Sequence, residues 1–135
     1  MKIIDGKNAI LGRLASYAAK EALKGEDIAI VDCEKIIITG NKENIKEEFE
    51  ATRKRVGSTQ NGPKISRMSE KIVKRAIRGM LPNYRNGRGR VAFKRIKCYV
   101  GVPKEFESAK KISAGREKEN GQSESKIMRV KEITK

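Results

Sequence analysis

The chain has 135 residues and a net charge of +15, from 32 Lys and Arg against 17 Asp and Glu, and it contains no histidine. This length suits one domain with a real hydrophobic core, and no apolar stretch approaches the roughly 18 residues that a membrane span requires. The lack of histidine removes the commonest general base and the commonest zinc ligand, which weakens the case for an enzyme or a zinc site.

The first forty residues predict an α/β unit. A strand is expected over Lys2–Asp5 and a helix over 11–24, where apolar residues recur at spacings of three and four. The runs Ile28–Val31 and 36–39 are continuously apolar and β-branched, which is typical of strands covered on both faces of a parallel sheet. Only residues 32–35 separate these two runs, far fewer than the dozen or so of a parallel crossover, so the topology of this connection stays open.

A second helix is expected from Asn41, a suitable N-cap, to about Arg55. Its glutamates come early and its basic residues late, which matches the helix macrodipole. The apolar face, Ile45 and Phe49, is thin. We therefore expect this helix at the edge of the fold, leading into the basic part of the chain.

Residues 51–99 carry most of the positive charge, with fifteen Lys and Arg against one acid, Glu70. Such a concentration of like charge destabilises a compact state and is usually neutralised by a polyanion, most often nucleic acid. A loop over 57–66 precedes a helix expected over Ser69–Met80, with Ser69 as its cap. At 100° per residue the apolar side chains of this helix share one face, and the opposite face is wholly cationic, with Lys71, Lys74, Arg75 and Arg78.

Pro82 should end this helix and open a Gly/Arg loop over 83–90. A helical turn over 91–96 and a strand over 97–102 should follow. From Lys104 onward the chain is charged and shows no convincing strand, so we expect one peripheral helix and a loose tail. The sequence thus predicts one α/β domain over 1–103 and a charged C-terminal extension over 104–135.

The basic region predicts a phosphate-binding surface. Like charges three and four residues apart destabilise an isolated helix, and a solvated helix face normally mixes signs. Arginine makes bidentate contacts to phosphate, and glycine lets a backbone approach closely. Tyr84 could stack on an unpaired base or simply pack over the loop. The residues predicted to bind RNA are Arg53, Lys54, Arg55, Lys64, Arg67, Lys71, Lys74, Arg75, Arg78, Arg85, Arg88, Arg90, Lys94 and Arg95.

Two other candidate sites are weaker. The turn over 6–13 lacks both G-x-G-x-x-G and G-x-x-x-x-G-K-[ST], so a nucleotide site there has little support, and Gly12 is expected to allow close packing of helix on sheet. Cys33 and Cys98 are 65 residues apart without C-x-x-C spacing, and we expect buried free thiols rather than a disulfide or a metal pair. Charge alone leaves three functions open: an RNA-binding protein, a DNA-binding or regulatory protein, and an enzyme acting on a nucleotide through the 6–13 turn.

Four sequence blocks together resemble the universal large-subunit ribosomal protein thirteen family. They are I-L-G-R-L-A-S over 10–16, E-K-I-I-I-T-G-N over 34–41, R-G-M-L-P over 78–82 and G-R-V-A-F-K-R-I-K-C-Y-V-G over 89–101. The blocks follow the family's order, the resemblance covers residues 3 to about 103, and R-G-M-L-P is the most specific of them. Without a histidine-rich segment after its last strand, the chain is similar to the archaeal and eukaryotic branch.

This resemblance implies a three-layer α/β/α fold around a mainly parallel four-stranded sheet, with the basic helix and loop inserted. It implies a cytoplasmic monomer within the large ribosomal subunit that contacts large-subunit rRNA and neighbouring ribosomal proteins and takes part in early assembly. It implies no catalysis, cofactor, small-molecule substrate or membrane. The family's RNA-facing basic region corresponds here to Arg78, Arg88, Arg90, Lys94 and Arg95.

Overall fold

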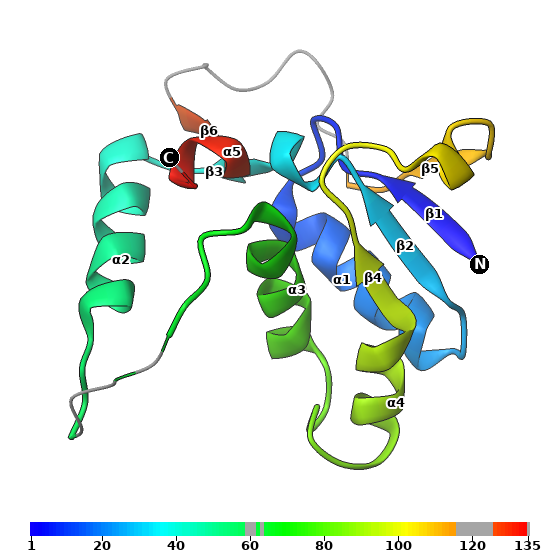
Figure 1. The fold of residues 1–135 in the computed structure, drawn as a ribbon, viewed down its shortest axis with the longest axis horizontal. Coiled ribbons are helices and arrows are strands. Elements are labelled where there is room, and N and C mark those ends of the chain that lie inside the picture. Colours follow the sequence, from blue (N-terminus) through cyan, green and yellow to red (C-terminus); the bar gives the residue numbers. More distant parts are fainter. Residues whose placement is uncertain (59–61, 63, 116–125, 135) are drawn as a thin grey trace.

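A four-stranded parallel sheet lies at the centre of the computed structural model, which describes residues 1–58, 62, 64–115 and 126–134 (Figure 1). Its central pair is β1 and β2, and Ile4 of β1 lies opposite Ile30 on one side and Ile112 on the other. The strands in spatial order are β4 (Ile96–Cys98), β2 (Ile28–Val31), β1 (Lys2–Asp5) and β5 (Lys111–Ser113).

Three helices cover one face of this sheet: α1 (Leu11–Leu23), α3 (Ser69–Met80) and α4 (Gly87–Arg95). The buried side of α1 is mostly alanine, which lets the helix lie close to Ile4 and Ile30. Gly12 has no part in this packing, because it is exposed and a Cβ there would meet nothing within 4 Å. The expectation that Gly12 serves close packing is therefore wrong.

The opposite face of the sheet presents Ile3, Ala29 and Val31. It is covered by the segment that follows β4, which contains the short 3-10 helix η2 (Lys104–Phe106). The three-layer α/β/α fold with a mainly parallel four-stranded sheet is confirmed, with a thin third layer. The side chains that pack on this face are Tyr99, Val102, Phe106 and Ala109.

The run over 36–39 does not join the parallel sheet. After β2, Asp32 takes a left-handed conformation (φ 53°) and the 3-10 turn η1 (Cys33–Lys35) carries the chain away from the sheet. The run then forms β3 (Ile37–Thr39), which pairs antiparallel with β6 (Ile127–Arg129). The five residues between β2 and β3 suffice because no parallel crossover is made, which answers the question that the sequence left open.

The expectation that no strand follows Lys104 is wrong. β5 pairs with β1 as the fourth strand of the sheet, and β6 pairs with β3. The short helix α5 (Val130–Ile133) follows β6 and buries Val130 and Ile133. A division into a domain over 1–103 and an extension over 104–135 stays a prediction of the sequence, although described residues of both parts share one sheet.

The helix α2 (Lys42–Lys54) lies at the edge of the fold, as expected (Figure 1). The Asn41 side chain accepts a hydrogen bond from the backbone N–H of Glu43 at 3.0 Å, which confirms this cap. None of the residues of α2 is buried, and Ile45 and Phe49 are half-buried. With so thin an apolar face, α2 extends from the body of the molecule.

Two other helix boundaries differ from expectation. The N-cap of α3 is Met68, and Ser69 is instead its first, buried residue; the Ser66 hydroxyl accepts from the Met68 backbone N–H at 3.2 Å. The helix expected over 91–96 begins earlier, because α4 starts at Gly87. Part of the expected Gly/Arg loop is therefore helical, and the strand after it is limited to Ile96–Cys98.

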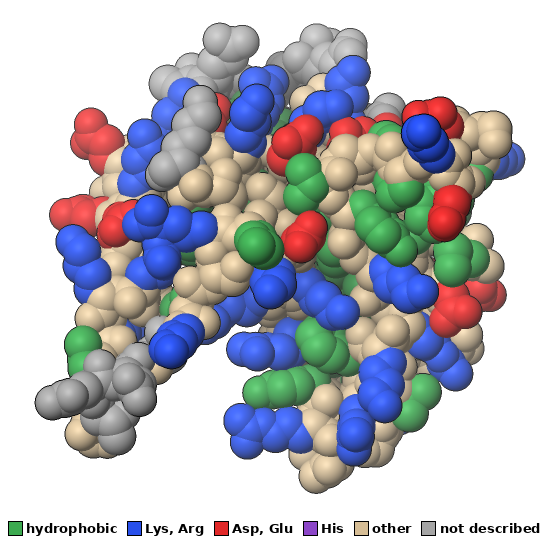
Figure 2. Space-filling model, viewed as in Figure 1, with side chains coloured by type: hydrophobic (Ala, Val, Ile, Leu, Met, Phe, Trp, Pro, Cys, Tyr) green, Lys and Arg blue, Asp and Glu red, His purple; other side chains and the backbone are tan. Residues whose placement is uncertain are grey.

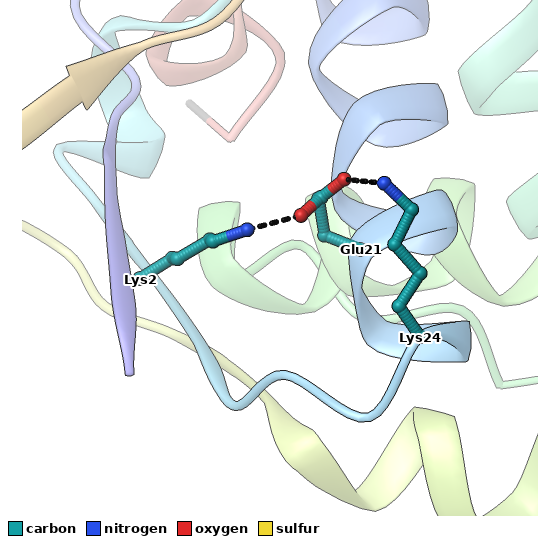
Figure 3. A network of polar contacts seen from close by, with 3 residues as sticks. All are labelled: Lys2, Glu21 and Lys24. Carbon is teal, nitrogen blue, oxygen red and sulfur yellow. Dashed lines mark hydrogen bonds and ion pairs between the residues drawn. The ribbon is translucent and has the colours of Figure 1, made fainter.

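A buried carboxylate ties α1 to the first strand (Figure 3). Glu21 is 6% exposed and accepts hydrogen bonds from Lys2 of β1 and, at 2.7 Å, from Lys24. The hydrogen bonds from Lys2 and Lys24 hold the pKa of Glu21 down at about 2, and the bond to Glu21 raises the pKa of Lys2. This network joins the N-terminus of the chain to the last turn of α1.

Glu21 should make the stability of the protein depend on pH in the acidic range. Since its folded pKa lies below the ordinary carboxyl value, the ionised form contributes stability above about pH 4.5, and this contribution is lost as the pH falls toward 2. We expect Glu21→Gln to be less stable than the parent protein at neutral pH, with most of the difference disappearing between those two pH values. Chemical unfolding at a series of pH values measures this. Glu47→Gln, an exposed change on α2, should retain the parent's profile, and a difference that persists at pH 2 would contradict the assignment.

Candidate nucleic-acid interface

α3 separates its apolar and cationic residues on opposite faces. Val73 and Ile77 are fully buried against the core. Lys71 and Arg75 are exposed, and Lys74 and Arg78 are half-buried. The hydrophobic face fixes the rotation of the helix, so the cations necessarily point away from the core.

Two aromatic rings lie beside this cationic face. The rings of Tyr84 and Phe93 meet edge to face, with centroids 6.1 Å apart. Lys74 Nζ lies 4.9 Å from the centroid of Phe93, and Arg78 Cζ lies 4.7 Å from that of Tyr84. Arg85 Cζ lies 5.5 Å from the same Tyr84 ring, and its Nε donates to the Tyr84 hydroxyl at 3.3 Å. We call these five residues the aromatic–cation cluster.

The cluster bears on the role of Tyr84. Its side chain is half-buried, and the geometry favours packing over the loop rather than an open platform for a base. The hydrogen bond from Arg85 and the nearby positive charges of Arg85, Arg78 and Arg75 lower the pKa of Tyr84. The phenol therefore sits in a strongly positive field.

Gly89 locks the start of α4 against the preceding loop. A Cβ at this position would lie 1.9 Å from the carbonyl oxygen of Pro82 and 2.7 Å from that of Asn83. Only glycine allows this approach, and it fixes Arg88 and Arg90 relative to α3. The sequence suggested glycines that let an RNA backbone approach, but at Gly89 the approaching backbone is the protein's own.

The remaining cations of α4 are divided between two directions. Arg88, Arg90 and Lys94 are exposed to solvent. Arg95 is half-buried and reaches toward the turn between α1 and β2, because a Cβ on Gly25 would lie 3.4 Å from its Nη1. Arg95 is thus not brought into the aromatic–cation cluster.

A second group of cations lies on α2 and the segment that leads to α3. Arg53 and Lys54 occupy the last turn of α2, and Arg55 and Lys64 are exposed further along. Arg53 Nη1 is buried without a hydrogen-bond partner in the described part of the chain. Figure 2 shows Lys and Arg side chains over the α2 side and over the α3 and α4 side of the hollow between them.

Few of the predicted binding residues are neutralised by carboxylates of the described residues. Of the fourteen, Arg67 alone forms an ion pair with a described carboxylate, Glu50, at 3.4 Å, and both side chains are about half exposed. Such an exposed pair contributes little stability. The other ion pairs between described residues use Lys2, Lys24 and Lys35, none of which was predicted to bind RNA. Thirteen cations therefore remain without an acidic partner in the described structure.

The turn before α1 is built for packing. A Cβ on Gly6 would lie 2.7 Å from the carbonyl oxygen of Val31, so the glycine is required by the sheet. The backbone N–H of Lys7 already donates to the Asp5 carboxylate at 2.9 Å. Because Gly6 packs against the sheet and the Lys7 N–H is already bonded, this turn offers a nucleotide phosphate few hydrogen-bond donors.

The described residues bring together no group of three or more metal-ligating side chains, and none of their helices is long and apolar enough to span a membrane. Cys33 is buried, Cys98 is half-buried, and both are free thiols. Two main causes raise the pKa of Cys33: the larger is its contact with the Cys98 thiol, and the smaller is its burial.

Comparison with known proteins finds one matching family and several relatives that share one name. A family described as Ribosomal protein L13 matches residues 1–105. The chain is 50% identical over 107 residues to the large ribosomal subunit protein uL13 of Methanopyrus kandleri, covering 79% of this chain and 66% of that protein. It is 48% identical over 116 residues to uL13 of Methanocaldococcus jannaschii, covering 84% of each chain. It is also 51% identical over 106 residues to uL13 of Methanococcus maripaludis, covering 76% of this chain and 77% of that one. The resemblance expected from the four sequence blocks, including its archaeal character, is confirmed.

Proposed function

This chain belongs to the ribosomal protein L13 family, and on that basis we propose that it is a structural, non-enzymatic constituent of the cytoplasmic large ribosomal subunit. We propose further that it binds large-subunit rRNA through the cationic face of α3 and the Gly/Arg segment over 83–90. The observation that carries this proposal is the set of thirteen basic side chains without an acidic partner among the described residues.

The proposed mechanism is neutralisation of phosphates where rRNA helices crowd together. The α/β core holds α3 and α4 rigidly, so their cations meet the ribose-phosphate strands in a fixed arrangement. Specificity would come from the shape of the RNA rather than from the edges of its bases. By reducing repulsion between RNA segments, the protein would support early assembly of the subunit, as a monomer beside neighbouring ribosomal proteins.

Two other functions have less support. A DNA-binding or regulatory role would use the same charge, but the curated relatives are named as large-subunit ribosomal proteins. An enzyme that binds a nucleotide at the 6–13 turn would need amides that Gly6 and Lys7 do not leave free. Competition between duplex DNA and structured rRNA at fixed salt separates the first alternative, and calorimetry with a mononucleotide tests the second.

The salt dependence of binding tests the proposed mechanism. About eight phosphate contacts should give a slope of log affinity against log salt of about −6 to −7, because each neutralised phosphate releases condensed counterions. Filter binding with an rRNA fragment over a range of salt concentrations measures this slope. A slope near −1 would contradict a broad cationic interface, whatever the affinity at one salt concentration.

A further inference from the structure

The aromatic–cation cluster holds three of the predicted RNA-binding cations in defined positions. Lys74 lies over Phe93, while Arg78 and Arg85 lie over Tyr84, at 4.9, 4.7 and 5.5 Å from the ring centroids. The edge-to-face contact between the rings joins α3, the following loop and α4 in one unit. The cluster therefore couples side chains that are distant in the sequence.

Ordinary core packing does not explain this arrangement. Lys74 and Arg78 are four residues apart on α3, so their charges repel each other. Both rings are only half-buried: Phe93 packs against the edge of the main hydrophobic cluster, and Tyr84 is not part of that cluster. The negative faces of aromatic rings attract cations, which offsets the repulsion and restricts long side chains that would otherwise sample many rotamers.

We propose that Tyr84 and Phe93 are positioning residues that hold Lys74, Arg78 and Arg85 over one surface before RNA arrives. Binding then requires less ordering of these three side chains, and preorganisation of this kind increases affinity without new contacts. This inference rests on the proposed function, because it concerns the same interface. In this proposal the two rings hold cations of the protein and do not stack on an RNA base.

If the rings position the cations, removing a ring should lower the affinity for RNA without changing the charge of the protein. Tyr84→Leu removes two cation–π contacts and should weaken rRNA binding about tenfold. Tyr84→Phe keeps the ring and loses only the acceptor for Arg85, so we expect a loss of about twofold to threefold. Neither change removes a cation, so the slope of affinity against salt should stay that of the parent protein.

Long-chain inorganic polyphosphate distinguishes positioning from stacking, because it presents phosphates without bases. If Tyr84 positions cations, Tyr84→Leu weakens binding to polyphosphate and to rRNA by similar factors. A loss confined to rRNA would assign Tyr84 to base stacking and overturn the proposal, as would unchanged affinity for both. Tyr99→Leu is the matched control: Tyr99 packs against Phe106 on the other face of the sheet, at 5.7 Å between centroids, and this variant should bind polyphosphate normally.

The positioning role of Tyr84 and the proposed binding of rRNA can fail separately. Far-UV circular dichroism checks that each variant is folded at the temperature of the binding assay. If Tyr84→Leu is not folded there, Phe93→Leu replaces it, because it removes the ring under Lys74, and unchanged affinity of that variant for both ligands would overturn the positioning role. Failure of the parent protein to bind rRNA with a steep salt slope would instead contradict the proposed function.

Discussion

Replacing Arg78 and Arg90 together by glutamate should abolish association with large-subunit rRNA and leave the far-UV circular dichroism unchanged. Arg78 lies on the cationic face of α3, Arg90 is exposed on α4, and neither forms an ion pair with a described carboxylate. Each charge-assisted contact to phosphate contributes about 1.5–3 kcal/mol, and the new carboxylates would also repel the RNA. We therefore expect at least a hundredfold loss of affinity.

The control for this variant must change the net charge equally. Lys7 and Lys110 are exposed and lie outside the predicted binding set, so Lys7→Glu with Lys110→Glu alters the total charge by the same amount. This control should retain most of the affinity, because Lys7 and Lys110 lie outside the proposed interface. Co-sedimentation of both variants with large subunits after a high-salt wash gives the comparison. Unaltered co-sedimentation of the arginine variant, or an equal loss in the control, would show that the RNA interface does not lie on α3 and α4.

The elements that the sequence predicted well are those in which side-chain spacing repeats over several turns or a whole strand. α1 and α3 were predicted from apolar residues at spacings of three and four, and their buried faces agree with that pattern. β1 and β2 were predicted at their observed bounds. Long periodic segments carry enough information to fix both the element and the face that it buries.

The errors in strand assignment fall on strands of three residues. β5 contains a single isoleucine between Lys111 and Ser113, so it has no periodicity to detect, and it forms because β1 presents a free edge. The bounds of β3 were nearly right but its pairing stayed open, because pairing with β6 depends on a segment about ninety residues further along the chain. Local pattern does not encode which distant strand a short apolar run will meet.

The candidate site was predicted as a list of charges, and its internal organisation was not. Clustered Lys and Arg are visible in the sequence, but the contacts of Lys74 with Phe93 and of Arg78 with Tyr84 depend on how α3, the loop and α4 meet. Arg95 was included because it belongs to the basic run, yet it reaches toward Gly25. The sequence shows Gly89 as a glycine between two arginines. Its role became clear only from the close approach of the Pro82 carbonyl group in the structure.

Gly89→Ala should destabilise the protein strongly. The added methyl group would overlap the carbonyl oxygen of Pro82, which belongs to the backbone and cannot move away by a change of rotamer. Overpacking of this kind costs about 3 kcal/mol or more, so we expect a fall in Tm on the order of 10 °C. Relief of the overlap requires the start of α4 to move away from Pro82, which would also displace Arg88 and Arg90 and weaken rRNA binding.

Gly79→Ala is the matched control, because it makes the same change near the end of α3. A Cβ at Gly79 meets nothing within 4 Å, and its φ lies outside the left-handed region. Alanine has the higher helix propensity, so this variant should be more stable than the parent protein by up to about 1 kcal/mol. Thermal unfolding of the two variants therefore gives shifts of opposite sign. Equal stability of Gly89→Ala and the parent protein would show that α4 does not begin against Pro82, and the fixed arrangement of cations on α3 and α4 would then lose its structural basis.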